Sequence, residues 1–223
     1  LREATNWSVP IQIKLGACRV ADDVKLAAKA GADSIVVDGM VAGTGASAEV
    51  LLDHSGIPTV PSIVMAREAL REIGLYRKVS LVASGGIRSG ADVAKALALG
   101  ADAVAIGIAA LIALNCNREI PESNFEEEIG VAAGQCHHCH TGKCPVGIAT
   151  QDSELVKRLD VDEGAERVAN FINSMTMELA LLTRSLGKSD VHSLEPEDLA
   201  ALTIEASAMA QIPLAGTDKV FGQ

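Results

Sequence analysis

The chain has 223 residues, enough for one large domain or two small ones, and 48% of them are hydrophobic, which predicts a substantial core. Its formal charge of -10 argues against a nucleic-acid-binding surface, because phosphate contacts need clustered lysine and arginine. No apolar run is long enough to span a bilayer and no leader-like segment opens the sequence, so we expect a cytoplasmic protein without membrane or nucleic-acid partners.

The first half of the chain contains an internal repeat at a spacing of 69 residues, as from Gly16 to Gly85. Each copy predicts a short apolar strand, a turn, a helix that ends at a Gly-Ala-Asp turn, and a second apolar strand. Gly31 and Gly100 lie where the end of a helix needs a residue that tolerates positive φ. A glycine-rich loop at residues 39–47 and a helix from about Pro61 to Ile73 separate the copies. The predicted strands are residues 11–15, 34–37, 79–83 and 103–106.

Strands that alternate with helices at this spacing indicate a parallel sheet of the α/β class. A closed β/α barrel has eight strands and about 250 residues, whereas four strands are found here. The chain also opens close to its first strand, without a preceding helix. We therefore predict strands five to eight, the C-terminal half of a TIM (β/α)8 barrel, over residues 1–111. The other half would be missing, cleaved away or supplied by another polypeptide; the alternative is a small open sheet that is complete in itself.

After residue 111 the pattern changes, first to a cysteine-rich cluster segment over residues 112–151 that includes an irregular acidic stretch. Residues 152–223 then form a predicted helical C-terminal extension that packs on the barrel. Its main helix covers residues 163–186 and stops at Gly187, and a second helix is expected over residues 199–209.

Two glycine loops follow the strands that would be seventh and eighth in a barrel, where phosphate groups commonly bind. The first is Ser84-Gly-Gly-Ile-Arg-Ser-Gly90, in which Gly85 and Gly86 let the backbone approach an anion and the next helix offers its amides. Gly107 gives similar access after the last strand. Together these loops predict a cradle for one phosphate monoester, such as that of FMN, although a lone Gly-Gly turn can be merely tight.

Lys14 lies near the end of an otherwise apolar strand, where a buried ammonium group needs an anionic partner. A reduced flavin or a substrate carboxylate would satisfy it, and an ion pair with Asp38 is the structural alternative. The loop that contains Gly43 and Gly45 has too many small residues for a packed helix. It either closes over a ligand or is a simple connection.

Four of the five cysteines are concentrated in one segment, which in a reducing compartment indicates metal binding rather than disulfides. Thiolates bind zinc or iron–sulfur clusters, and a proline after the last cysteine is familiar from ferredoxin-like clusters. An iron–sulfur cluster is therefore favoured; zinc, with His137, His138 or His140 as further ligands, and a redox disulfide remain alternatives. Cys18 is expected to be a small buried side chain or to contact a ligand. The four clustered cysteines are Cys116, Cys136, Cys139 and Cys144.

Several of these stretches resemble the FMN-binding synthase domain of the glutamate synthase large subunit, including its N-methylglutamate-synthase-like relatives. The resemblance covers about residues 8–155, and its most specific part is Cys139-His-Thr-Gly-Lys-Cys-Pro-Val-Gly-Ile-Ala-Thr-Gln151. The other matching stretches are Ile11-Gln-Ile-Lys-Leu15, Gly43-Thr-Gly-Ala-Ser47, Ser84-Gly-Gly-Ile-Arg-Ser-Gly90 and Ile112-Ala-Leu-Asn-Cys116.

The resemblance implies an FMN enzyme that reduces 2-iminoglutarate, formed from 2-oxoglutarate and ammonia, to glutamate. It implies that Lys14 contacts flavin or substrate, and that Gly85, Gly86 and Gly107 contact the FMN phosphate. Electrons would come through a [3Fe–4S] cluster on three cysteines, Cys116, Cys139 and Cys144. Further implied partners are a ferredoxin or reductase subunit as electron donor and an amidotransferase subunit, within an oligomer.

The sequence departs from that family pattern in three places. An acidic insertion separates Cys116 from Cys139, and Cys136 is an extra thiol that makes a [4Fe–4S] cluster possible. Met40-Val-Ala and Ala48 stand around the Gly-Thr-Gly-Ala-Ser stretch where the family usually has other residues, so an altered substrate pocket is credible. The alternative functions are therefore an FMN and iron–sulfur enzyme acting on an N-alkyl amine, and a non-catalytic, zinc-bound structural subunit.

Overall fold

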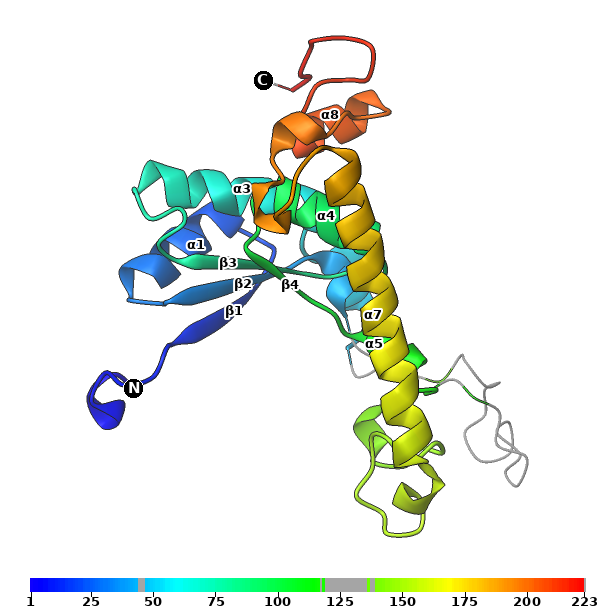
Figure 1. Ribbon diagram of the computed structural model, residues 1–223. Helices are drawn as coiled ribbons and strands as arrows, with labels where there is room; N and C mark the ends of the chain where they lie inside the picture. Colours follow the sequence, from blue (N-terminus) through cyan, green and yellow to red (C-terminus); the bar gives the residue numbers. More distant parts are fainter. Residues whose placement is uncertain (44–46, 117, 119–135, 137–138, 223) are drawn as a thin grey trace.

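This computed structural model describes the chain except residues 44–46, 117, 119–135, 137–138 and 223, which Figure 1 draws in grey. Its centre is a four-stranded parallel sheet in the order β1-β2-β3-β4. The sheet confirms the predicted α/β class and all four predicted strands within one or two residues. The strands are β1 (Gln12–Gly16), β2 (Ser34–Asp38), β3 (Ser80–Ser84) and β4 (Ala103–Ala105).

Helices α1 (Val20–Lys29), α3 (Thr59–Glu72) and α4 (Gly90–Ala98) connect the strands and lie together on one side of the sheet (Figure 1). The side chains that alternate toward them form the buried core with Ile35, Val37 and Leu81, each at most 1% exposed. Several 3-10 turns of three residues lie before β1 and in the connections between the longer elements. The short elements of the described chain are α2 (Glu49–His54) and the turns Glu3–Thr5, Met40–Ala42, Cys139–Thr141, Val156–Arg158, Val191–Ser193 and Pro196–Asp198.

Both copies of the internal repeat contain the same pair of hydrogen bonds near the start of a strand. Asp33, after helix α1, accepts a hydrogen bond from the Ile11 amide at 2.6 Å and donates its own amide to the Ile11 carbonyl at 2.9 Å. Asp102, after helix α4, does the same with Leu81, at 2.8 and 2.7 Å. The preceding glycines have the expected positive φ, +92° at Gly31 and +116° at Gly100.

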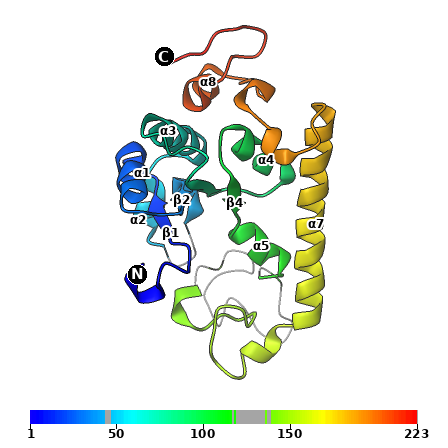
Figure 2. The same ribbon diagram turned by 60° about the vertical axis from the view of Figure 1, so that its left-hand side comes forward.

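The other face of the sheet, away from the helices, carries polar and small side chains together with Val36 and Val82. Its row at the C-terminal edge is Gly16, Asp38, Ser84 and Ala105, which are paired in register across all four strands. Within the described chain no helix covers this face (Figures 1 and 2). Such a face is what half of a barrel presents when the opposite strands are not part of the chain.

Two further helices join the C-terminal part to the sheet layer. Helix α5 (Ile108–Ala113) follows β4, and the 25-residue helix α7 (Val161–Ser185) packs on both α4 and α5 (Figure 2). Gly90 permits this packing, because a Cβ there would strike backbone atoms of α7, including the Leu179 amide nitrogen at 2.6 Å. None of the helices in the described ranges combines the length and hydropathy needed to cross a bilayer.

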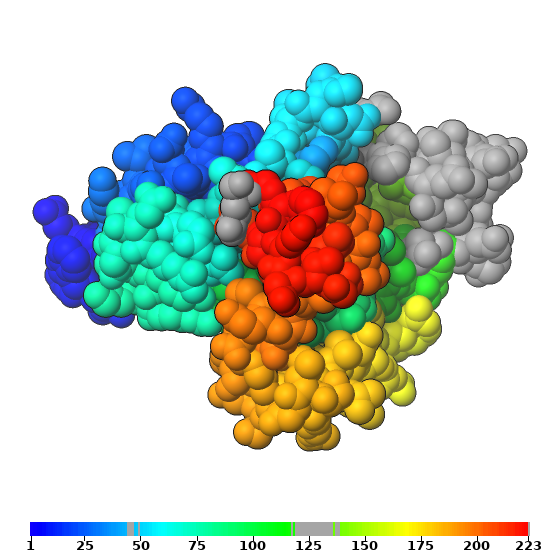
Figure 3. All heavy atoms as spheres, turned by 90° about the horizontal axis from the view of Figure 1, so that it is seen from above, coloured from blue at the N-terminus to red at the C-terminus, as the bar shows by residue number. Residues whose placement is uncertain are grey.

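The end of the chain covers helices α3 and α4. Figure 3 shows its orange and red atoms over the middle of the molecule. Helix α8 (Ile204–Ala210) begins later than expected, because Glu195 and Asp198 cap a separate 3-10 turn and Leu199 is extended. Thr203 then caps α8 by accepting a hydrogen bond from the Ala206 amide.

Gly90→Ala tests the contact between α4 and α7. The added methyl group meets backbone atoms that cannot rotate away, so we expect the free energy of unfolding to fall by about 1–3 kcal/mol, measured by urea denaturation. Gly16→Ala is the control, since a Cβ at that position has no heavy atom within 4 Å. Equal stability of the two variants would show that α7 does not approach α4 this closely.

Asp33→Asn tests the hydrogen bonds that Asp33 makes near the start of the strand, through the pH dependence of stability. Hydrogen bonds from Arg2 and the Ile11 amide hold the pKa of Asp33 below its ordinary value of 3.8. The carboxylate therefore stabilises the fold above that value, and the gain is lost as the pH falls through the lowered pKa. We expect the urea midpoint of the native protein to exceed that of the variant at neutral pH and the difference to shrink in acid. A difference that is independent of pH would contradict this.

Candidate functional site

The four clustered cysteines surround one cavity of about 240 Å³ next to the C-terminal edge of the sheet. Gly43, after the 3-10 turn that follows β2, and Gly107, after β4, line the same cavity. Two glycines predicted to contact a cofactor and all four predicted metal ligands are thus brought together. The other lining residues are small or apolar: Ala42, Ile108, Leu111, Pro145, Val146, Ile148 and Ala149.

The cysteines reach this cavity from separate segments. Cys116 follows helix α5, and its amide donates to the Leu111 carbonyl at 3.0 Å. Cys139 opens a 3-10 turn, and Cys144 is buried against Val146 after it. Cys116 and Cys136 are half-buried and pack against that pair, whereas Cys139 is exposed.

The thiols are close enough to affect one another. Burial raises the pKa of the Cys116 thiol most, and the other three sulfurs raise it further. Burial likewise raises the pKa of Cys139, followed by the charges of Cys136 and Cys144. Several thiolates in one partly apolar cavity are therefore unfavourable unless cationic iron or zinc compensates their charge.

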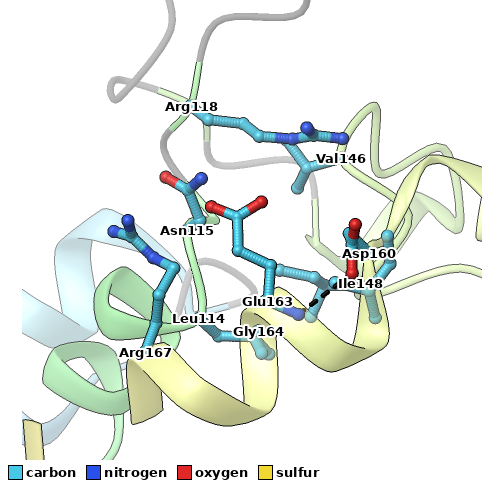
Figure 4. A pocket seen from close by; sticks show the side chains of 10 residues that line it. Leu114, Asn115, Arg118, Val146, Ile148, Asp160, Glu163, Gly164 and Arg167 are labelled. Atoms are coloured by element: carbon cyan, nitrogen blue, oxygen red, sulfur yellow. Dashed lines mark hydrogen bonds between the residues drawn. The ribbon is translucent and has the colours of Figure 1, made fainter. Parts of the chain in front are cut away.

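The residues that hold the cysteine loop come from the C-terminal part of the chain. Arg158 Nη1 donates to the Pro145 carbonyl at 3.0 Å, directly after Cys144. Arg167, on helix α7, donates through Nε to the Ala113 carbonyl at 3.0 Å, at the end of α5. Figure 4 shows the cleft between these segments, where Glu163 and Arg167 of α7 face Asn115 and Arg118. Arg118 in turn donates to the Arg158 carbonyl.

Lys14 forms the ion pair with Asp38, at 2.8 Å, that was the structural alternative for its role. Its side chain is 60% exposed, so the expectation of a buried lysine is wrong. The reason is that β1 is an edge strand whose uncovered face carries Lys14. Asp38 is more buried, and its Oδ1 has no hydrogen-bond partner in the described chain, so Lys14 is the cation that compensates this carboxylate. The pair still lies at the C-terminal edge of the sheet, beside Ser84.

The glycine loop after β3 is explained in part by packing. Gly85 and Gly86 have positive φ, +110° and +73°. A Cβ on Gly85 would lie 2.7 Å from Thr59 Oγ1, which donates to the Gly85 carbonyl at 2.9 Å. A Cβ on Gly86 would lie 3.0 Å from Val41. The two glycines therefore let the loops after β2 and β3 approach each other, whatever they bind.

The amides at the start of α4 are not free, contrary to the sequence-based expectation. The Arg88 and Ser89 amides donate to Asp92 Oδ2, and the Gly90 amide donates to Glu178 Oε2 of α7 at 2.7 Å. These carboxylates already satisfy the positive end of the α4 dipole. Helix α5, by contrast, begins after Gly107 without a side-chain cap.

The remaining predicted site residues lie elsewhere or cannot be placed. Cys18 is exposed on the loop after β1, so the expectation of a buried side chain is wrong. His140 is exposed, and Gly45, His137 and His138 lie outside the described residues. Among the residues that the structure describes, no three His, Cys, Asp or Glu side chains are grouped to hold a single metal ion.

Comparison with known proteins gives a consistent result. A model of the conserved region in glutamate synthase matches residues 1–121 and 124–189. A glutamate synthase large subunit-like protein of Rhizobium meliloti (strain 1021) is 54% identical over 97% of this chain and 49% of its own length. An archaeal glutamate synthase [NADPH] of Methanocaldococcus jannaschii is 45% identical over 87% of this chain and 35% of its own length. The chain thus spans half or less of the length of these relatives.

Solved structures support the fold. A mutant flavocytochrome b2 with pyruvate bound superposes with a TM-score of 0.53, at 22% identity, over 91% of this chain and 37% of that one. A second mutant of flavocytochrome b2 gives a TM-score of 0.51 at 21% identity. At this identity the likeness concerns the fold alone, and it agrees with part of a β/α barrel.

Arg158→Gln tests how the cysteine loop is held. Loss of a charge-assisted hydrogen bond to the Pro145 carbonyl removes about 1.5–3 kcal/mol, so we expect amide hydrogen exchange over residues 139–150 to rise about tenfold or more. Lys157→Gln is the matched control, because Lys157 pairs only with the exposed Glu154 among the contacts found in the described chain. Unchanged exchange in the Arg158 variant would mean that other contacts hold the loop.

Proposed function

Because the chain belongs to the glutamate synthase family, we propose that it forms the FMN and iron–sulfur part of an oxidoreductase that reduces 2-iminoglutarate to glutamate. The imine forms from 2-oxoglutarate and ammonia. As the chain spans only part of its relatives, this activity is proposed for the full-length protein.

One observation carries the proposal: four thiols and two loop glycines from the sheet edge line a single cavity. Thiolates are the usual ligands of iron–sulfur clusters, and a cation bound there would compensate the thiolates of Cys116 and Cys139, whose pKa is raised mainly by burial. The glycines leave backbone access on the sheet side of that cavity. A cluster and a flavin held there would lie next to each other, as electron transfer requires.

The residues at the sheet edge fit an anionic, planar ligand. A Cβ at Gly107 would have no other heavy atom within 4 Å, so there is room for a ligand beside the end of β4. For the phosphate we propose the loops at Gly85, Gly86 and Gly107, without the start of α4, whose Gly90 amide already donates to Glu178. Gly16 and Ser84 are small residues, so they leave space for a ligand at the C-terminal edge of the sheet.

A bound FMN supplies hydride chemistry at the imine carbon. Lys14 presents an ammonium group at the sheet edge, where it binds a substrate carboxylate or the negative charge of a reduced ring. Asp38 holds Lys14 Nζ at 2.8 Å and so fixes where that positive charge lies. Ile108 and Leu111 give the cavity an apolar lining on the side of the cysteines.

Partners follow from the same chemistry. The names of an archaeal and an archaeal-type glutamate synthase among the relatives include NADPH, so we propose a nicotinamide-dependent reductase subunit or a ferredoxin as electron donor. Ammonia comes from solution or from an amidotransferase subunit. An N-alkyl amine is the second candidate substrate, because Ala42 and Gly43, in the loop that departs from the family pattern, line the cavity.

The test uses the full-length protein, purified without oxygen. We expect the absorption bands of flavin together with a broad iron–sulfur shoulder, and glutamate formation from 2-oxoglutarate, ammonia and a reduced donor. Methylamine in place of ammonia identifies the second candidate if N-methylglutamate forms faster than glutamate. A colourless protein that contains zinc would reject both functions and favour the structural subunit.

A further inference from the structure

We infer that Cys136 is the fourth ligand of a four-iron cluster, together with Cys116, Cys139 and Cys144. The inference rests on the proposed function, since it concerns the type of cluster in that same site. Three-cysteine ligation, as the family resemblance implies, would leave Cys136 without a role. The structure places it with the other three.

The position of Cys136 carries the inference. Its residue lines the same cavity as the other three cysteines, and it packs, half-buried, against Cys144 and Val146 just as Cys116 does. A thiol that served no ligand would not need to lie in the cavity wall beside three others. The fifth cysteine, Cys18, is exposed on the loop after β1 and does not line the cavity.

The spread of the thiols suits a cluster better than a single ion. Four thiolates on one zinc, each about 2.3 Å from the metal, must converge on one point. The four cysteines instead come from separate segments and line a cavity of about 240 Å³. In a cubane cluster each thiolate binds a different iron, so the four ligands surround the cluster and need not converge on one point. A thiol that bound an iron ion would release its proton to solvent.

The experiment compares the full-length native protein with Cys136→Ser and Cys18→Ser, all purified anaerobically because oxygen removes labile iron. Iron and sulfide are counted per chain, and electron paramagnetic resonance is recorded before and after reduction by dithionite. A four-iron cluster is silent when oxidised and paramagnetic after gaining one electron, whereas a three-iron cluster is paramagnetic when oxidised.

We expect about four irons per chain and a silent oxidised state for the native protein and for Cys18→Ser. We expect Cys136→Ser to hold about three irons, with a signal in the oxidised state, or to lose the cluster. A native protein that shows the oxidised three-iron signal overturns the inference without recourse to any variant. So does an unchanged iron count and signal in Cys136→Ser. Absence of iron from the native protein would instead reject the proposed function itself.

Discussion

The candidate site depends on the contact between helices α7 and α4 at Gly90. There the α7 backbone comes so near that only glycine fits, and Glu178 accepts a hydrogen bond from the Gly90 amide. At about 1.5 Å per residue, the 25 residues of α7 extend some 37 Å. One rigid helix therefore joins the helix layer of the sheet to the end that carries Arg167. Arg167 of α7 and Arg158, which lies in the turn just before α7, each donate a hydrogen bond to one of the two segments that flank the cysteine cavity.

The same contact bears on where an anion can bind. Glu178 and Asp92 bring negative charge to the start of α4, which neutralises the helix end that a glycine loop usually offers to phosphate. A phosphate would meet repulsion there. The uncapped start of α5 carries no such carboxylate bond, and it borders the cysteines as well. The amides at the start of α4 are therefore bonded within the protein, and the loop glycines before them are left for any ligand contact.

Local patterns in the sequence were sufficient for the strands, the repeat and the positive φ of Gly31 and Gly100, because each follows from period, turn chemistry or backbone sterics. The grouping of the four cysteines followed from their spacing. The exposure of Lys14 did not, because it depends on which strand lies at the edge of the sheet. The roles of Arg158, Arg167 and Glu178 depend on contacts across 13 to 88 residues of chain, for which a single sequence contains no signal.

The two strand-start aspartates show how this fold was built. Asp33 and Asp102, which are 69 residues apart, make the same pair of bonds with Ile11 and Leu81, which are 70 residues apart. Such agreement in detail is expected if an ancestral gene segment was duplicated and the copies stayed fused. Their loops then diverged: one copy reads Gly16-Ala-Cys-Arg19 and the other Gly85-Gly-Ile-Arg88. The two copies thus share their hydrogen-bonded scaffold, whereas their equivalent loops at the sheet edge differ in sequence and can serve different functions.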